Sequence, residues 1–418
     1  MTQSSLLLRE QAFLRLWGAQ SVSAFGARIT REGLPIMAVM TLGASPSALG
    51  VLAAVAGAAG LVTSLGSGGF VDRSARRPIL VWTDLGRAAA LLSLPLAAWF
   101  HVLTLVQVYI VAAGIAGASA LFDIADHAYL PSLIDPERLT EANARLGSTD
   151  GAAEMAGPAL AGVLFQWLTA PVAVLVNAAT YLVSALLLSG IRATEQVEGA
   201  PSDRTGLLSG LATGARLVFG NPLARVLLFT STVGGLFGGV FGALYILFVL
   251  RTLGLGPVVL GLGIACGGLG ALTGSLVAPR IAQWLGVGPS IVLCSAGSAL
   301  GTMVLLFAPP HSAGAVGYLV AQQFVGDFLG VIPIILGTTL LQSIIPLEAL
   351  GRVRAVFRGA SGFAMVLGAL AGGAVGQAVG VRETLFLAIG GLLLGPVIAV
   401  FTPLWKTRDM RQGVAADH

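Results

Sequence analysis

The sequence predicts an all-α integral membrane protein with twelve transmembrane helices in two pseudo-symmetric six-helix bundles. Hydrophobic residues occupy 56% of the 418 positions and charged residues only 10%, and the mean hydropathy is +0.89. A soluble domain carries about one quarter charged residues. Apolar runs close to the roughly 20 residues that a membrane-spanning helix needs recur along the whole chain. The short alternating segments of a β-barrel are absent from the sequence.

Each apolar run is expected to form one transmembrane helix, because short polar or Gly- and Pro-marked breaks separate the runs. The runs cover residues 13–40, 47–70, 79–99, 104–128, 146–168, 171–191, 224–250, 257–282, 288–308, 314–343, 354–379 and 383–404. The 57 glycines of the chain favour close helix packing through small residues. A polar start followed by a long apolar run predicts no cleavable signal peptide. Cys266 and Cys294 fall inside apolar runs and are expected to be packing residues.

The longest polar connection lies between the sixth and seventh runs and divides the chain in two. We expect an N-terminal bundle over 1–191, a cytoplasmic linker with an amphipathic helix over 192–222, a C-terminal bundle over 223–405 and a cytoplasmic tail over 406–418. "GGFVDRSARR" near the end of the second run matches "GSLVAPRIAQ" near the end of the eighth. Two such parallel halves are typical of transporters that rock around a site at the membrane midplane.

Positive charge is distributed unequally between alternate loops. Of 23 lysines and arginines, 18 fall in the amino-terminal segment, alternate loops and the carboxyl tail, and only Arg251 and Arg382 fall on the opposite side. The other three, Arg28, Arg31 and Arg87, lie inside apolar runs. Because short cytoplasmic loops retain positive charge, both termini are expected in the cytoplasm. The net charge of +4 is thus a topology signal, and we expect no nucleic-acid partner.

The loop between the second and third runs reads "GGFVDRSARRPIL". It resembles the loop signature of the major facilitator superfamily, with Ala75 where glycine is usual. The matching positions are Gly68, Asp72, Arg73, Arg76 and Arg77. An acid beside fixed arginines can form charge-assisted bonds in one conformational state and release them in another, so this loop is a candidate gate. The alternative is that the arginines only anchor the topology.

A second resemblance is to the bacterial drug, macrolide and siderophore exporters of that superfamily. It is carried by "FDIADHAYLPSLIDPERLTEANARLGSTDGAAEMAGPALAGVL" and by "DLGRAAALL". Within the first stretch, "GPALAG" resembles the antiporter signature of the fifth span, with Gly157 and Pro158 in place as gate candidates. The resemblance implies export of small amphipathic, drug-like molecules by alternating access with proton antiport, as in multidrug resistance, from a bacterial cytoplasmic (inner) membrane.

Charged residues inside spans are costly and usually face a cavity. Arg28, Arg31 and Glu32 occupy positions i, i+3 and i+4 of the first span and therefore share one helical stripe. One interpretation is that Arg28 and Glu32 form an ion pair that neutralises both charges and has only a structural role. Arg31 is then left over, which suggests an anionic or polar substrate group, or a partner carboxylate from another span. Asp84 and Arg87, at i and i+3, are expected to support the neighbouring loop.

Further candidates for substrate binding or coupling lie in other spans. Asp327 is about 14 residues from the outer end of the tenth span and hence close to the midplane, with Gln323 one turn away. We expect Asp327 to bind the coupling proton or to pair with the cations of the first span. Glu154 and Asp123 are weaker candidates, with helix packing or a gate role as the alternative. Phe241 and Tyr245 form a stripe that could line an apolar pocket, although aromatic packing is commoner.

No enzymatic apparatus is visible in the sequence. There is no phosphate-binding Walker loop and no nucleophile, histidine and acid set in a shared loop, and the lone His127 in its span makes no metal site. We therefore expect a transporter without cofactor or metal, driven by the proton gradient, monomeric, with the lipid bilayer and a small-molecule substrate as its partners. Alternatives are an exporter of siderophores or other anionic metabolites, a lysophospholipid flippase, and a non-transporting receptor, which the duplicated halves disfavour.

Overall fold

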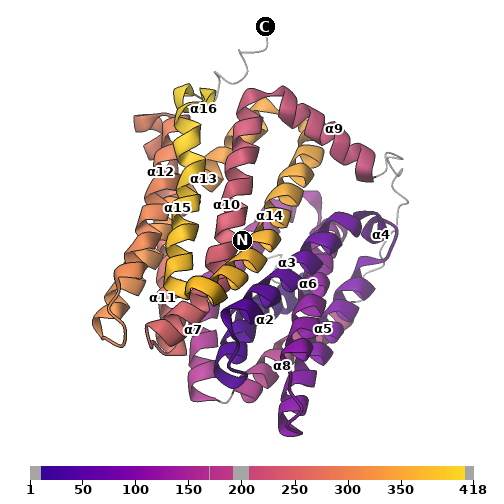
Figure 1. Ribbon diagram of the computed structural model, residues 1–418. Coiled ribbons are helices and arrows are strands. Elements are labelled where there is room, and N and C mark those ends of the chain that lie inside the picture. The colour runs from indigo at the N-terminus through magenta and orange to yellow at the C-terminus, as the bar shows by residue number, and fades with distance from the viewer. Residues whose placement is uncertain (1–10, 169, 192–206, 410–418) are drawn as a thin grey trace, which may run out of the picture. The chain divides into compact units, whose positions relative to one another are not determined.

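The computed structural model describes residues 11–168, 170–191 and 207–409 (Figure 1). Across these ranges the chain forms helices joined by short turns, and no strand occurs. The predicted linker falls partly outside the described residues, at 192–206, and so does most of the predicted tail, at 410–418. The predicted all-α membrane fold is confirmed.

Six long helices make up the first half of the chain. They are α2 (Gln11–Thr41), α3 (Pro46–Gly66), α5 (Arg76–Trp99), α6 (Leu105–Leu133), α7 (Leu139–Trp167) and α8 (Ala170–Ser189). Short helical turns, α4 (Gly68–Asp72) and η1 (Pro136–Arg138), lie in two of the connections.

The second half again contains six long helices. They are α10 (Pro222–Leu247), α11 (Pro257–Leu285), α12 (Val287–Met303), α13 (Gly314–Ile344), α14 (Leu350–Val379) and α15 (Val381–Val400). A π-helical segment, η2 (Phe248–Thr252), extends α10, and a 3₁₀ turn, η3 (Val304–Phe307), extends α12. The shorter elements are α9 (Leu207–Gly220), η4 (Leu347–Ala349) and α16 (Pro403–Lys406).

Local chemistry explains where several helices begin. The side chain of Thr104 accepts a hydrogen bond from the backbone N–H of Gln107 at the start of α6, and Asn221 caps α10 in the same way. Pro222 follows Asn221 at the first helical position, where its missing N–H costs nothing. Gly286 and Gly380, with φ of 91° and 109°, allow the sharp reversals before α12 and α15.

Ten helices in the described ranges are long and apolar enough to cross a membrane. The long helices α2 and α7 are not among them. Both carry several charged side chains, including Arg28, Arg31 and Glu32 in α2 and Asp150 and Glu154 in α7. These charged residues account for the absence of α2 and α7 from the apolar spans.

The chain forms two compact units, and α3 is shared between them. One unit contains Met1–Ala44 and Val55–Asp203, and the other contains Ser45–Ala54 and Arg204–His418. In the first unit, buried residues of α2, α5, α6 and α8 form the core. In the second unit, α10 packs directly on α14, and α9 packs against both of them.

Candidate functional site

Four charged side chains of α2 and α7 form one ion-pair network. The Nη2 of Arg28 lies 2.7 Å from Oε2 of Glu154, and the Nη2 of Arg31 lies 3.0 Å from Oε1 of the same carboxylate. The Nε of Arg31 lies 2.8 Å from Oε1 of Glu32. The predicted Arg28–Glu32 pair is therefore wrong, because Arg28 turns towards α7. Arg31 is not left over, since it contacts two carboxylates, and one of these comes from another span.

Gly157 makes this network possible. A Cβ atom at Gly157 would lie 2.5 Å from the Cβ of Arg28, so only glycine lets α2 approach α7 this closely. Glu154 lies three residues earlier on α7, on the same side of the helix. Gly157 and Pro158 are both buried. Their role as a gate stays a prediction. In the structure they follow Glu154 on α7, one turn after the carboxylate that pairs with Arg28.

Further acids lie beside the network on α6 and α7. Asp123 interacts electrostatically with Arg28, Arg87, His127 and Asp150, but among the described residues it lies in no ion pair. Asp150 also interacts with Arg28 and with Glu154. Asp126, one turn along α6 from Asp123, accepts a hydrogen bond from Gln20 of α2.

Ion pairs and electrostatic interactions connect acids and arginines in this part of the first unit. They involve Asp84, Arg87, Asp123, Arg28, Glu154, Arg31 and Glu32. The sequence does not predict these interactions, because the groups come from four different helices. The part of the chain that the structure describes holds no group of three or more His, Cys, Asp or Glu side chains placed to bind a metal ion.

Asp84 and Arg87 lie in the interior and not at the loop. Their side chains are 0% and 2% exposed, and they form an ion pair with each other. α5 begins at Arg76, so Asp84 lies more than two turns inside the helix. The support of the neighbouring loop by this pair stays a prediction.

The charged loop predicted as a gate spans α4 and the start of α5. Asp72 and Arg73 are exposed. Arg77 donates from Nε to the carbonyl oxygen of Leu188 at 3.0 Å and from Nη2 to that of Ser189. These carbonyls end α8, where a cation is favoured. Arg77 therefore links the start of α5 to the end of α8 within the first unit.

The gate role of Asp72 can be tested by Asp72→Asn. We expect the variant to fold and insert normally but to shift the balance between inward-facing and outward-facing states, because the neutral side chain loses charge-assisted bonds. Labelling of single cysteines on either side of the membrane measures this balance. Unchanged labelling together with unchanged transport would rule out the gate role.

The candidates of the second unit lie on α10 and α13. Asp327 reaches α11, where a Cβ at Gly267 would overlap its Oδ2. Gln322 donates from Nε2 to Oε1 of Gln323 at 3.0 Å, and both side chains are buried. On α10, the rings of Phe241 and Tyr245 stack with centroids 5.4 Å apart.

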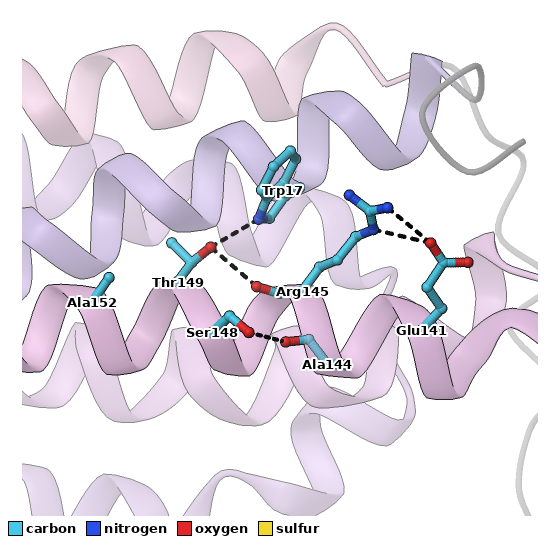
Figure 2. Close-up of a pocket in the computed structure, with 7 residues that line it drawn as sticks. All are labelled: Trp17, Glu141, Ala144, Arg145, Ser148, Thr149 and Ala152. Carbon is cyan, nitrogen blue, oxygen red and sulfur yellow. Dashed lines mark hydrogen bonds and ion pairs between the residues drawn. The ribbon is translucent and has the colours of Figure 1, made fainter. Parts of the chain in front are cut away.

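A separate pocket of about 450 Å³ lies along α7 beside α2 (Figure 2). The indole Nε1 of Trp17 donates to Oγ1 of Thr149 at 2.9 Å, and Arg145 forms an ion pair with Glu141. None of these lining residues is predicted from the sequence. Trp17 is an aromatic residue of α2, and Glu141 and Arg145 are a charged pair at i, i+4 spacing on α7. Such residues also occur on ordinary helix surfaces.

Comparison with known proteins agrees with this architecture. The family profile of the Major Facilitator Superfamily matches residues 16–369. The chain is 26% identical to the uncharacterized MFS-type transporter YfiS of Bacillus subtilis (strain 168), over 97% of this chain and 95% of that protein. It is 28% identical to the multidrug efflux pump Tap of Mycolicibacterium fortuitum, over 84% of this chain and 86% of that protein.

Solved structures show the same fold. The nucleoside transporter NupG is similar with a TM-score of 0.74 at 12% identity, over 94% of this chain and 98% of that one. A bacterial homologue of the human lysosomal transporter Spinster, in an inward-facing and unoccupied conformation, is similar with a TM-score of 0.72 at 13% identity, over 98% of this chain and 100% of that one. With the family profile extending over most of its length, this multi-pass membrane chain belongs to the Major Facilitator Superfamily.

Proposed function

We propose that this transporter exports small amphipathic molecules across the bacterial cytoplasmic membrane by alternating access, in exchange for protons. The observation that carries the proposal is the set of charged side chains that the spans α2, α6 and α7 bring together in the first unit. Carboxylates within a bundle are expensive to keep charged and are the usual groups for proton binding in transporters. The similarity to a multidrug efflux pump supports export.

The charge balance of the site favours a substrate with a cationic group. Apart from the closed Asp84–Arg87 pair, the site holds more acids than arginines. The acids are Glu32, Asp123, Asp126, Asp150 and Glu154, and the arginines are Arg28 and Arg31. An excess of carboxylates attracts a cation and repels an anion. The exposed Asp123, which has no ion-pair partner in the described residues, is the carboxylate that we assign to this group.

Competition between a cation and a proton for one carboxylate produces exchange. A proton on Asp123 removes the charge that binds the cation, and the bound cation opposes protonation by the same free energy. An anion would have the opposite effect, because it binds more easily once nearby acids are protonated. The anionic-metabolite alternative depended on a spare Arg31, and Arg31 is held by Glu32 and Glu154.

The proposal can be tested in proteoliposomes with two probes of permanent charge. We expect accumulation of radiolabelled tetraphenylphosphonium in response to an acidic lumen, and none of taurocholate, a sulfonate anion. For one proton per cation, the limit is about tenfold accumulation per pH unit, because each unit is worth about 1.4 kcal/mol. Nigericin, which dissipates the pH gradient, should abolish accumulation.

Two glutamate variants are compared, and Glu137→Gln is the matched control for Glu154→Gln. Glu154→Gln leaves Arg28 and Arg31 without their shared carboxylate and should lose most of the accumulation, whereas Glu137→Gln, on an exposed turn, should keep it. Accumulation of taurocholate alone would favour the anionic alternative. Movement of a labelled lysophospholipid between leaflets, without accumulation of either ion, would favour the flippase.

A further inference from the structure

The helix α8 packs against the side of α2 that faces away from the ion pairs with α7. Gly26 and Thr30, one turn apart, lie on this side, and Arg28 lies on the opposite one. A Cβ at Gly26 would lie 2.2 Å from Oγ1 of Thr180 in α8, so glycine permits the close approach. Gly157 permits the approach of α7 on the other side. The helix α2 is therefore held closely between α7 and α8.

The hydroxyl of Thr30 uses its full hydrogen-bonding capacity at the contact with α8. It donates to the carbonyl oxygen of Gly26 at 3.0 Å. Because its single proton is then used, its two acceptor positions take Nδ2 of Asn177 at 2.6 Å and the hydroxyl of Tyr181 at 3.4 Å. Both partners belong to α8, and all three side chains are buried. A rotation of α2 would leave these buried polar groups unpaired, which is costly.

Tyr181 is itself held in place from α5. The guanidinium carbon of Arg87 lies 4.4 Å from the centroid of its ring, and Nη2 of Arg87 donates to Oγ of Ser23 in α2 at 3.3 Å. Ser23 lies two turns before Thr30, on the same side of α2. Polar contacts therefore fix α2 at two points along one side, and they determine which way its charged side faces.

We propose that Thr30 is a positioning residue for the ion-pair network. Through its two partners in α8 it fixes the rotation of α2 about the helix axis, and it thereby directs Arg28 and Arg31 towards Glu154. Arg31 directly follows Thr30 in the chain, so the two side chains turn together. The effect of the network on a cationic substrate rests on the proposed function, but the positioning of the two arginines does not.

Two substitutions separate the hydroxyl of Thr30 from the bulk of its side chain. Thr30→Val keeps the shape and leaves Asn177 without its acceptor, whereas Thr30→Ser keeps the hydroxyl and removes a methyl group. The matched control is Thr339→Val in α13, because in the described part of the chain the hydroxyl of Thr339 bonds only to Ile335 of its own helix. If Thr30→Val does not fold, Thr30→Val/Asn177→Leu replaces it, since that variant leaves no unpaired amide.

Thermal unfolding in detergent tests the positioning without any substrate. The fall in unfolding temperature caused by Thr30→Val is measured in the wild type and in Glu154→Gln, which lacks the shared carboxylate of the ion pairs. We expect a smaller fall in Glu154→Gln, because the arrangement that Thr30 preserves is already lost there. Thr339→Val should cause the same fall in both backgrounds. Equal falls for Thr30→Val as well would overturn the proposal, and so would a larger effect of Thr30→Ser than of Thr30→Val.

Binding of tetraphenylphosphonium in detergent tests the consequence for transport. We expect Thr30→Val to weaken binding about threefold to tenfold, which corresponds to the loss of one hydrogen bond. The reason is that Arg28, once released from Glu154, neutralises acids that attract the cation. Thr30→Ser and Thr339→Val should bind normally. Normal binding by Thr30→Val, together with the coupled unfolding temperatures, would keep the positioning role and contradict the cation site of the proposed function.

Discussion

Asp123→Asn is expected to abolish both the binding and the gradient-driven accumulation of tetraphenylphosphonium, whereas Asp327→Asn is expected to abolish only the accumulation. The amide of Asp123→Asn has no charge, so it can neither attract the cation nor exchange a proton. Asp327 lies in the second unit, against Gly267 of α11. Its amide imitates a permanently protonated carboxyl and stops net pumping, while exchange of bound cation continues.

Three measurements on each variant distinguish these outcomes. Equilibrium binding in detergent reports the cation site, counterflow between loaded proteoliposomes reports exchange, and accumulation under a pH gradient reports coupling. Asp135→Asn, in an exposed turn, is the matched control and should retain all three activities. Normal pumping by Asp327→Asn would remove Asp327 from the coupling mechanism and leave Glu154 and Asp123 as the acids to examine.

Gly157→Val is expected to give the largest loss of transport among glycine substitutions in α7. Because a Cβ at this position collides with the Cβ of Arg28, the added side chain must push α2 away from α7 and separate Arg28 from Glu154. Overpacking of this kind costs about 1–3 kcal/mol of folding free energy. Thermal unfolding in detergent, followed by tryptophan fluorescence, measures this loss next to the accumulation assay.

Gly147 supplies the internal control for this prediction. It lies on the same helix, and a Cβ there would meet nothing within 4 Å. Gly147→Ala should be neutral or slightly stabilising, since alanine favours a helix by about 1 kcal/mol over glycine. Equal behaviour of Gly147→Ala and Gly157→Ala would show that the close approach of α2 and α7 is unimportant.

The sequence was sufficient for the fold because a bilayer imposes a pattern that can be read locally. Apolar runs near 20 residues and the breaks between them give the long helices, and twelve of these are present in the described ranges. The errors concern the ends of runs. The third apolar run begins at residue 79, after the charged residues Arg76 and Arg77, whereas α5 begins at Arg76. That shift placed Asp84 and Arg87 too close to the loop.

The pairing of charges was harder to predict than the helices. Spacing within α2 shows that Arg28, Arg31 and Glu32 share a stripe, but it contains no information on the neighbouring helix. The partner of Arg28 is determined by contact with α7, and that contact depends on Gly157. A usable signal did exist, because "GPALAG" begins three residues after Glu154. A glycine one turn from an acidic residue inside a span indicates that another helix passes close to the acid at that depth in the membrane.

The division of α3 has a consequence for experiments on fragments. Cutting the chain between the sixth and seventh spans would separate two polypeptides at an apparently natural boundary. The second polypeptide would then lack Ser45–Ala54, a segment that packs in the same unit and whose Ala54 packs against Ala243 and Ala369. It would expose small apolar side chains to lipid that normally meet another helix. The two polypeptides must therefore be produced together, and a circular permutant needs its new ends outside α3.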